Sequence, residues 1–122
     1  MVDDSTEISS LIEDVLSCEG ASVTVCDSGE EAMSLLQISP FHLVILDLLM
    51  PRPNGRDILA FCRQLRPDLL DRTIVLTAER RCPDVMLLGE HRIRVAHKPF
   101  DLDVFRATAR EVIDRAQRRA SA

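Results

Sequence analysis

The stretch Leu43-Val44-Ile45-Leu46-Asp47-Leu48-Leu49-Met50-Pro51-Arg52-Pro53-Asn54-Gly55 decides the fold of this chain. A run of consecutive aliphatic residues is typical of a strand that is buried on both faces, and the prolines and the Asn-Gly pair after it predict a turn. Asp47 therefore stands where a buried strand reaches the edge of its sheet. Open α/β sheets keep their chemistry at the carboxyl ends of their strands, so Asp47 is the first candidate functional residue.

Other polar residues lie at the ends of short apolar segments. They are Asp3-Asp4 after Met1-Val2, Thr77 after Thr73-Ile74-Val75-Leu76, and Lys98 before Pro99-Phe100. A parallel sheet would bring all of them to the edge that carries Asp47. Taken alone, Asp3-Asp4 could cap a helix, Thr77 could simply end a strand, and Lys98 could be a solvated loop charge. Asp47 is harder to explain in this way, because a carboxylate after buried aliphatics needs a partner or water.

Length and composition indicate one globular domain over residues 1–122, large enough to bury a real core. The sequence is 46% hydrophobic without an apolar run long enough to span a membrane, so we expect a cytoplasmic protein with no membrane contact. The net charge of -5 argues against nucleic-acid binding by this domain. The basic residues near the end, Arg115, Arg118 and Arg119, are expected to sit favourably at a helix C-terminus.

The cysteines and histidines do not predict a metal or phosphotransfer site. Cys18, Cys26, Cys62 and Cys82 form no C-x-x-C pair and are interpreted as reduced core or surface thiols. The histidines, which we interpret as structural or solvated, are His42, His91 and His97.

Helices and strands are predicted to alternate along the chain. Apolar residues at helical spacing predict helices from Ile8 to Leu16 with Gly20 as the stop, from Ser28 to the residue before Pro40, from Gly55 to Pro67, and from Asp101 through Ala116. The predicted strands are Ser22 to Cys26, Leu43 to Leu46, Thr73 to Leu76 and Ile93 to Ala96. The charged region from Glu79 to Arg92 contains the block Met86-Leu87-Leu88 and is predicted as a short helix.

This order predicts a doubly wound, five-stranded parallel sheet in a three-layer α/β/α arrangement. The first strand has only Met1-Val2 before Asp3, so it is predicted to be truncated. Either an upstream segment or a partner would have to complete it, because a shortened central strand leaves its neighbours without ladder hydrogen bonds.

These motifs together resemble the receiver domains of two-component response regulators. The resemblance covers essentially the whole chain and is carried by Asp3-Asp4, by Asp47 with Met50-Pro51 and Asn54-Gly55, by Thr77-Ala78, and by Lys98-Pro99-Phe100. Each motif is weak by itself, but the set in this order and spacing is specific. The resemblance implies a receiver-like, or flavodoxin-like, fold.

The resemblance also implies roles for the candidate residues. Asp47 would be the phosphoacceptor, and Mg²⁺, with Mn²⁺ as an alternative, would bind Asp4 directly, Asp3 mostly through water, Asp47, and the backbone carbonyl of Leu49. Hard oxygen ligands of this kind suit both cations. Lys98 would pair with one phosphoryl oxygen and the hydroxyl of Thr77 would move to bind another.

One position departs from the receiver pattern. Three residues before Lys98, receivers usually carry a Tyr or Phe that rotates together with the Thr, and this chain has Val95. A β-branched aliphatic cannot swing a ring between inward and outward positions. The aromatic part of the switch is therefore not expected here.

The sequence thus predicts a signalling domain rather than an enzyme with turnover. Its partners would be a sensor histidine kinase or a histidine phosphotransfer protein, and a downstream protein target or output domain, and homodimerisation stays open. Two alternatives remain: a pseudo-receiver that binds or dimerises without phosphorylation, and a phosphatase-like enzyme. The second would need a substrate-covering cap, for which the chain has no spare residues.

Overall fold

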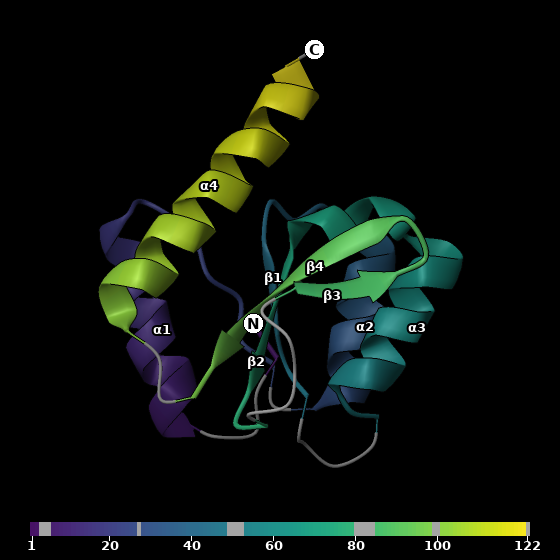
Figure 1. Cartoon of the computed structure of the whole chain (residues 1–122), viewed down its shortest axis with the longest axis horizontal. Helices are drawn as coiled ribbons and strands as arrows, with labels where there is room; N and C mark the ends of the chain where they lie inside the picture. The colour runs from purple at the N-terminus through teal and green to yellow at the C-terminus, as the bar shows by residue number, and fades with distance from the viewer. Residues whose placement is uncertain (3–5, 27, 49–52, 80–84, 99–100, 122) are drawn as a thin grey trace.

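The computed structural model describes residues 1–2, 6–26, 28–48, 53–79, 85–98 and 101–121. Helices flank a central sheet on both sides, and the last helix extends away from the body (Figure 1). The elements are α1 (Thr6–Cys18), α2 (Gly29–Ile38), β1 (Val44–Asp47), α3 (Gly55–Leu65), the 3₁₀ helix η1 (Pro67–Arg72), β2 (Thr73–Thr77), β3 (Val85–Leu88), β4 (His91–His97) and α4 (Leu102–Ser121).

Side chains alternate between the two faces of the sheet and divide the core into two halves. Ile45, Ile74 and Leu76 pack with α1 and α4, whereas Leu46 and Val75 pack with α2 and α3. This alternation is the expected period of a strand. The predicted three-layer, doubly wound arrangement is therefore confirmed.

The predicted strand at Asp47 and the strand from Thr73 form the centre of the sheet. The strand order is β1-β2-β4-β3, in which β1, β2 and β4 are parallel neighbours. All residues of β1 and β2 are buried, as their uninterrupted aliphatic sequences predict. Their carboxyl ends consequently lie at one edge.

Side chains cap the two helices that were predicted to begin at Ser28 and at Asp101. The Ser28 hydroxyl accepts a hydrogen bond from the Glu31 backbone N–H at the start of α2. The Asp101 carboxylate accepts from the backbone N–H groups of Asp103 and Val104 at the start of α4. In each case a side-chain oxygen satisfies N–H groups that have no partner within the helix.

The predicted helix between Glu79 and Arg92 is wrong. Residues Val85–Leu88 form β3, which pairs antiparallel with β4 through a two-residue turn at Gly89 and Glu90. Gly89 has φ 63°, which fits the first central position of a type II′ turn. Met86 and Leu88 are partly buried against the α2/α3 half of the core, whereas Val85 and Leu87 are exposed, so the block alternates as a strand does.

The predicted sheet of five parallel strands differs in detail from the observed sheet. Among the described residues the sheet has four strands, and β3 is antiparallel. At the place of the predicted first strand, Val2 makes isolated parallel bridges to Cys26 and Leu46. Within the described residues, the predicted strand from Ser22 has only the bridge at Cys26.

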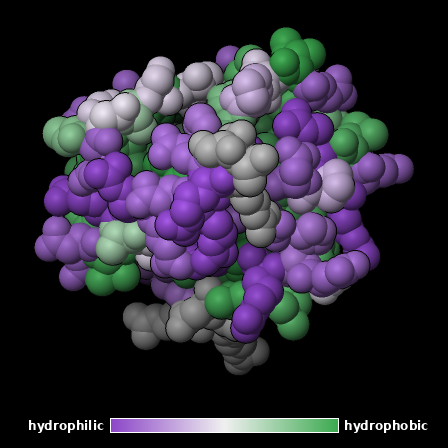
Figure 2. Space-filling model, turned by 90° about the horizontal axis from the view of Figure 1, so that it is seen from above, coloured by the Kyte–Doolittle hydropathy of each residue, from purple (hydrophilic) through white to green (hydrophobic). Residues whose placement is uncertain are grey.

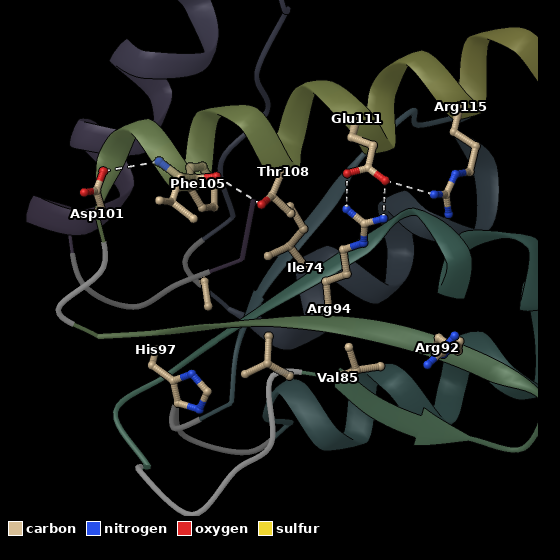
Figure 3. Close-up of a pocket in the computed structure, with 13 residues that line it drawn as sticks. Ile74, Val85, Arg92, Arg94, His97, Asp101, Phe105, Thr108, Glu111 and Arg115 are labelled. Carbon is tan, nitrogen blue, oxygen red and sulfur yellow. Dashed lines mark hydrogen bonds and ion pairs between the residues drawn. The ribbon is translucent and has the colours of Figure 1, made fainter.

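Helix α4 is fastened to β4 by a charged contact. The Arg94 guanidinium donates to both carboxylate oxygens of Glu111, at 2.9 and 2.6 Å, and Arg115 donates to the same carboxylate at 3.1 Å (Figure 3). The hydrogen bonds from Arg94, and to a smaller extent the positive charge of Arg115, hold the pKa of Glu111 below its usual value. The contact borders a groove of about 820 Å³ between β4 and α4.

The face of the molecule at the top of the view in Figure 1 is largely polar. Seen from above, hydrophilic side chains cover most of the visible face, with smaller hydrophobic patches between them (Figure 2). Within the described part of the chain, no helix combines the length and the apolar character needed to cross a bilayer.

Replacing Gly89 tests the hairpin. Gly89→Ala should destabilise the domain by about 1–2 kcal/mol, because a side chain disfavours the left-handed conformation. Urea unfolding measures this difference. The control Glu90→Ala, in the same turn at negative φ, should stay within about 0.5 kcal/mol of the parent. Equal effects of the two substitutions would contradict the observed turn.

Candidate functional site

Three of the predicted site residues meet at one edge of the sheet. Asp47 is the last residue of β1, Thr77 is the last residue of β2, and Lys98 directly follows β4. In the sheet register Asp47 pairs with Leu76, and Thr77 pairs with His97. The parallel order therefore brings together side chains that are up to 51 residues apart in sequence.

Asp47 and Lys98 form a direct ion pair. Lys98 Nζ donates to Asp47 Oδ2 at 2.9 Å, and only 5% of the Asp47 side chain and 20% of the Lys98 side chain are exposed. A buried carboxylate is costly without a cation or hydrogen-bond donors. Because β2 lies between their strands, Lys98 reaches across the end of β2 to make this contact.

Thr77 lies between these two residues and is fully buried. Its hydroxyl oxygen accepts from the Glu79 backbone N–H at 3.0 Å, and its carbonyl accepts from the Lys98 backbone N–H at 2.7 Å. Thr77 thus holds the backbone of Lys98 in place and keeps its hydroxyl close to the edge. A hydroxyl can rotate to donate to a new acceptor.

The Asn-Gly pair fixes the start of α3 against the end of β1. Asn54 and Asp57 form a reciprocal capping box, in which each side chain accepts from the other's backbone N–H, at 3.1 and 2.9 Å. A Cβ at Gly55 would lie 2.5 Å from the carbonyl oxygen of Asp47. Only glycine permits this approach without displacing the backbone next to the candidate acceptor.

A more exposed ion pair flanks the site. Arg56 and Glu79 approach to 3.6 Å, with 55% and 41% of their side chains exposed. Glu79 begins the charged region that the sequence analysis identified, whereas Arg56 was not named there. Arg56 follows Gly55 in the first turn of α3. Its proximity to the site could have been inferred only from the prediction that a helix begins beside Asp47. Exposed pairs of this kind contribute little stability.

The predicted metal ligands other than Asp47 lie outside the described residues. These are Asp3, Asp4 and Leu49. Val2, which precedes the first two, accepts a hydrogen bond through its carbonyl from the Asp47 backbone N–H at 3.0 Å. No group of three or more His, Cys, Asp or Glu residues suited to a metal occurs among the residues that are described.

The model of the response regulator receiver domain family matches residues 1–110. The chain belongs to this family. Its fold, its signalling role and the phosphoacceptor function of the family follow from this membership. Receiver domains generally bind Mg²⁺ at the phosphorylation site.

Curated relatives support the assignment. The chain is 41% identical over 78 residues to the transcriptional regulatory protein CpxR of Klebsiella pneumoniae, which is 64% of this chain and 32% of CpxR. It is 31% identical over 116 residues to the response regulator ArlR of Staphylococcus epidermidis, covering 94% of this chain and 52% of ArlR. This receiver therefore spans between a third and about half of the relatives it matches.

Solved structures show the same fold. A signal receiver domain of a putative Luxo repressor protein from Vibrio parahaemolyticus aligns with a TM-score of 0.84 at 22% identity, covering 98% of this chain and 91% of that one. A receiver domain from Methanospirillum hungatei aligns with a TM-score of 0.75 at 22% identity, covering 96% and 94%. The receiver-like fold predicted from the sequence is therefore confirmed.

Replacing Gly55 tests how tightly α3 supports the site. Gly55→Ala should cost about 1–3 kcal/mol, because the new methyl group overlaps the Asp47 carbonyl. It should also shift the Asp47 amide resonance in NMR spectra. Gly20→Ala is the control: φ is 84°, but nothing lies within 4 Å of the added Cβ, so the Asp47 resonance should not move. An unchanged Asp47 resonance in Gly55→Ala would contradict the close approach.

Proposed function

We propose that this receiver accepts a phosphoryl group on Asp47 from a sensor histidine kinase or a histidine phosphotransfer protein in the cytoplasm. The observation that carries the proposal is the contact between Lys98 Nζ and Asp47 Oδ2, at 2.9 Å, at the end of three parallel strands. It puts a carboxylate nucleophile and a cation for the transferred oxygens in one place. Residues 1–122 would form this single receiver domain.

The proposed step transfers a phosphoryl group from a histidine nitrogen of the donor to a carboxylate oxygen of Asp47. A carboxylate oxygen of Asp47 forms a bond to phosphorus while the bond from phosphorus to the donor's histidine nitrogen breaks, and the imidazole keeps that electron pair. Catalysis of this kind depends on positioning and on charge stabilisation. Lys98 supplies one positive charge, and Thr77 supplies a hydroxyl donor on the strand between them.

The donor chemistry of the edge fits Mg²⁺ or Mn²⁺. Asp47 offers a hard carboxylate at the sheet edge, and the resemblance adds Asp3, Asp4 and the backbone carbonyl of Leu49. Mg²⁺ binds such oxygens and keeps several waters. When bound, the cation would neutralise the phosphoryl oxygens and relieve repulsion among the carboxylates.

Phosphorylation would change the surface formed by β4 and α4. A phosphoryl group on Asp47 gives Lys98 and the Thr77 hydroxyl a new acceptor, so their present contacts would have to change. Lys98 continues β4, and β4 holds α4 through Arg94 and Glu111. This continuous route supports a shift in affinity for a downstream target or output domain. The names of the relatives suggest transcriptional regulation as its context.

A pseudo-receiver is the second candidate. The β3–β4 hairpin and Val95 in place of an aromatic residue favour it. In that case the domain would bind a partner or dimerise without phosphorylation. The ion pair of Asp47 with Lys98 would then serve stability alone.

The first test is intact mass after incubation with acetyl phosphate and Mg²⁺. We expect a gain of one phosphoryl group that disappears when Mg²⁺ is chelated and in Asp47→Asn. Asp103→Asn, an exposed carboxylate in α4, is the matched control and should be labelled normally. Labelling of Asp47→Asn would identify a different acceptor, and no labelling of the folded parent would favour the pseudo-receiver.

The second test separates acceptance from response. Thr77→Ala should accept the phosphoryl group but lose most of the change in amide exchange along β4 and α4, because the hydroxyl that would bind the phosphoryl oxygen is gone. Thr77→Ser keeps a hydroxyl and should restore the response. If Thr77→Ala responds as fully as the parent, Thr77 has no switching role.

A further inference from the structure

Strand β3 forms one edge of the sheet. It lies beyond β4 in the order β1-β2-β4-β3, and among the described residues no strand pairs with its outer side (Figure 1). Charged residues, prolines and bulges usually protect such an edge from pairing with another chain. Val85–Leu88 contains only aliphatic residues and methionine, and it pairs with β4 without a bulge. Within the strand itself, none of these protections is present.

One hydrogen bond shows which backbone groups of β4 face β3. The Lys98 backbone N–H donates to the Thr77 carbonyl at 2.7 Å, so the backbone groups of Lys98 point towards β2. In a strand, the N–H and C=O groups of successive residues point to opposite sides. His91 lies an odd number of residues before Lys98, and its backbone groups consequently point towards β3.

The register of the hairpin then fixes the direction of the backbone groups of β3. Leu88 pairs with His91 across the two-residue turn, and such a turn is flanked by a hydrogen-bonded pair. Leu88 and Met86 therefore direct their N–H and C=O groups at β4. Val85 and Leu87 alternate with them, so their N–H and C=O groups point away from the sheet.

The side chains of the same two residues are apolar and exposed. The exposed fraction is 37% for Val85 and 72% for Leu87. Val85 borders the groove of about 820 Å³ between β4 and α4, and Leu87 points to the same face of the sheet because it is two residues further along the strand (Figure 3). Met86 points to the opposite face and is only partly buried. The edge thus combines outward backbone groups with apolar side chains.

A second copy of β3 offers the matching arrangement. If two copies run antiparallel with Met86 opposite Met86 of the second copy, Val85 of each copy lies opposite Leu87 of the other. Each of these two pairs can exchange two N–H···O=C hydrogen bonds, which uses every outward group of both residues. Their four apolar side chains would meet on the face that carries α4. The arrangement is twofold symmetric and closes at two copies.

The charges beside β3 are compatible with this pairing. On β4, Arg92 is the neighbour of Leu87 and Arg94 is the neighbour of Val85. Across the interface, Arg92 of one copy and Arg94 of the other would be three strand spacings apart. This separation of about 14 Å exceeds the screening length of about 8 Å at physiological ionic strength. Arg94 is also paired with Glu111 in its own chain.

We propose that the outer edge of β3 is a homodimerisation site at which two copies of this receiver join their sheets. The strand contributes only 4 residues per copy. The buried area should therefore fall below the roughly 800 Å² per partner that is typical of stable complexes, which predicts a dissociation constant on the order of 100 µM. The pairing uses no group of the Asp47 site, so it does not depend on the proposed phosphoacceptor function.

Sedimentation velocity of the unphosphorylated chain, from about 10 µM to about 1 mM, tests the association. We expect the dimer fraction to rise with concentration. Leu87→Lys places a charge on the edge and should raise the dissociation constant about tenfold or more. Ile38→Lys makes the same change at a 79% exposed position on α2 and should leave the constant unchanged. A chain that stays monomeric at about 1 mM, or equal effects of the two substitutions, would overturn the proposal.

Cysteine cross-linking tests the register, in a background that carries Cys18→Ser and Cys82→Ser. Met86→Cys would place two thiols opposite each other at the twofold axis, where Cα atoms about 4.5 Å apart permit a disulfide. Oxidation should therefore give a covalent dimer. The control Leu87→Cys has its two thiols on diagonal positions and should cross-link far less. A dimer that sediments but does not cross-link through Met86→Cys would show association through another surface and overturn the proposal.

Discussion

The ion pair between Asp47 and Lys98 is the constraint on which the arrangement of this domain depends. Its carboxylate is almost fully buried, and the amine comes from a strand that is not adjacent to β1. Two strand spacings amount to about 10 Å, which the Lys98 and Asp47 side chains span together with the hydrogen bond between them. The pair therefore depends on β4 lying no more than two strand positions from β1, because a larger separation would leave the buried carboxylate without this cation.

The same contact explains why Thr77 occupies the middle position. Lys98 crosses the end of β2, where Thr77 accepts its backbone N–H and offers a short polar side chain. A large apolar residue at this position would obstruct the crossing, and a charged residue would compete with the pair. On the other flank, Gly55 lets α3 start directly against the Asp47 carbonyl. The ends of the strands thus support one side of the site, and the start of α3 supports another.

The sequence predicted the parts of the fold that depend on burial and failed where a turn decided the outcome. The uninterrupted aliphatic runs before Asp47 and Thr77 can be satisfied only at the centre of a sheet, and both strands were found there. In contrast, Met86-Leu87-Leu88 fits either a helix or a strand. The Gly89-Glu90 pair before the strand at His91 was the signal for a hairpin, because it can form a two-residue turn.

The ion pair of Asp47 with Lys98 could not be derived from the residues alone. No residue near Lys98 in the sequence specifies Asp47 as its partner. Their contact follows from the order of three parallel strands, which the sequence indicates only through its alternation of helices and strands. The contact of Arg94 with Glu111 was not predicted at all. It depends on the angle at which α4 crosses β4, and this angle is a result of packing rather than of spacing in the sequence.

The absence of an aromatic residue at Val95 changes how a signal could pass along β4. Val95 pairs with Val75 inside the sheet, and its branched side chain has little rotamer freedom. The neighbouring Arg94 contacts a half-exposed carboxylate on α4, and such contacts cost little to break and reform. We infer that α4 would respond to Asp47 through movement of the β4 backbone and its ion pairs. A rotating ring would be unnecessary, since Lys98 already joins the acceptor to the strand that holds the helix.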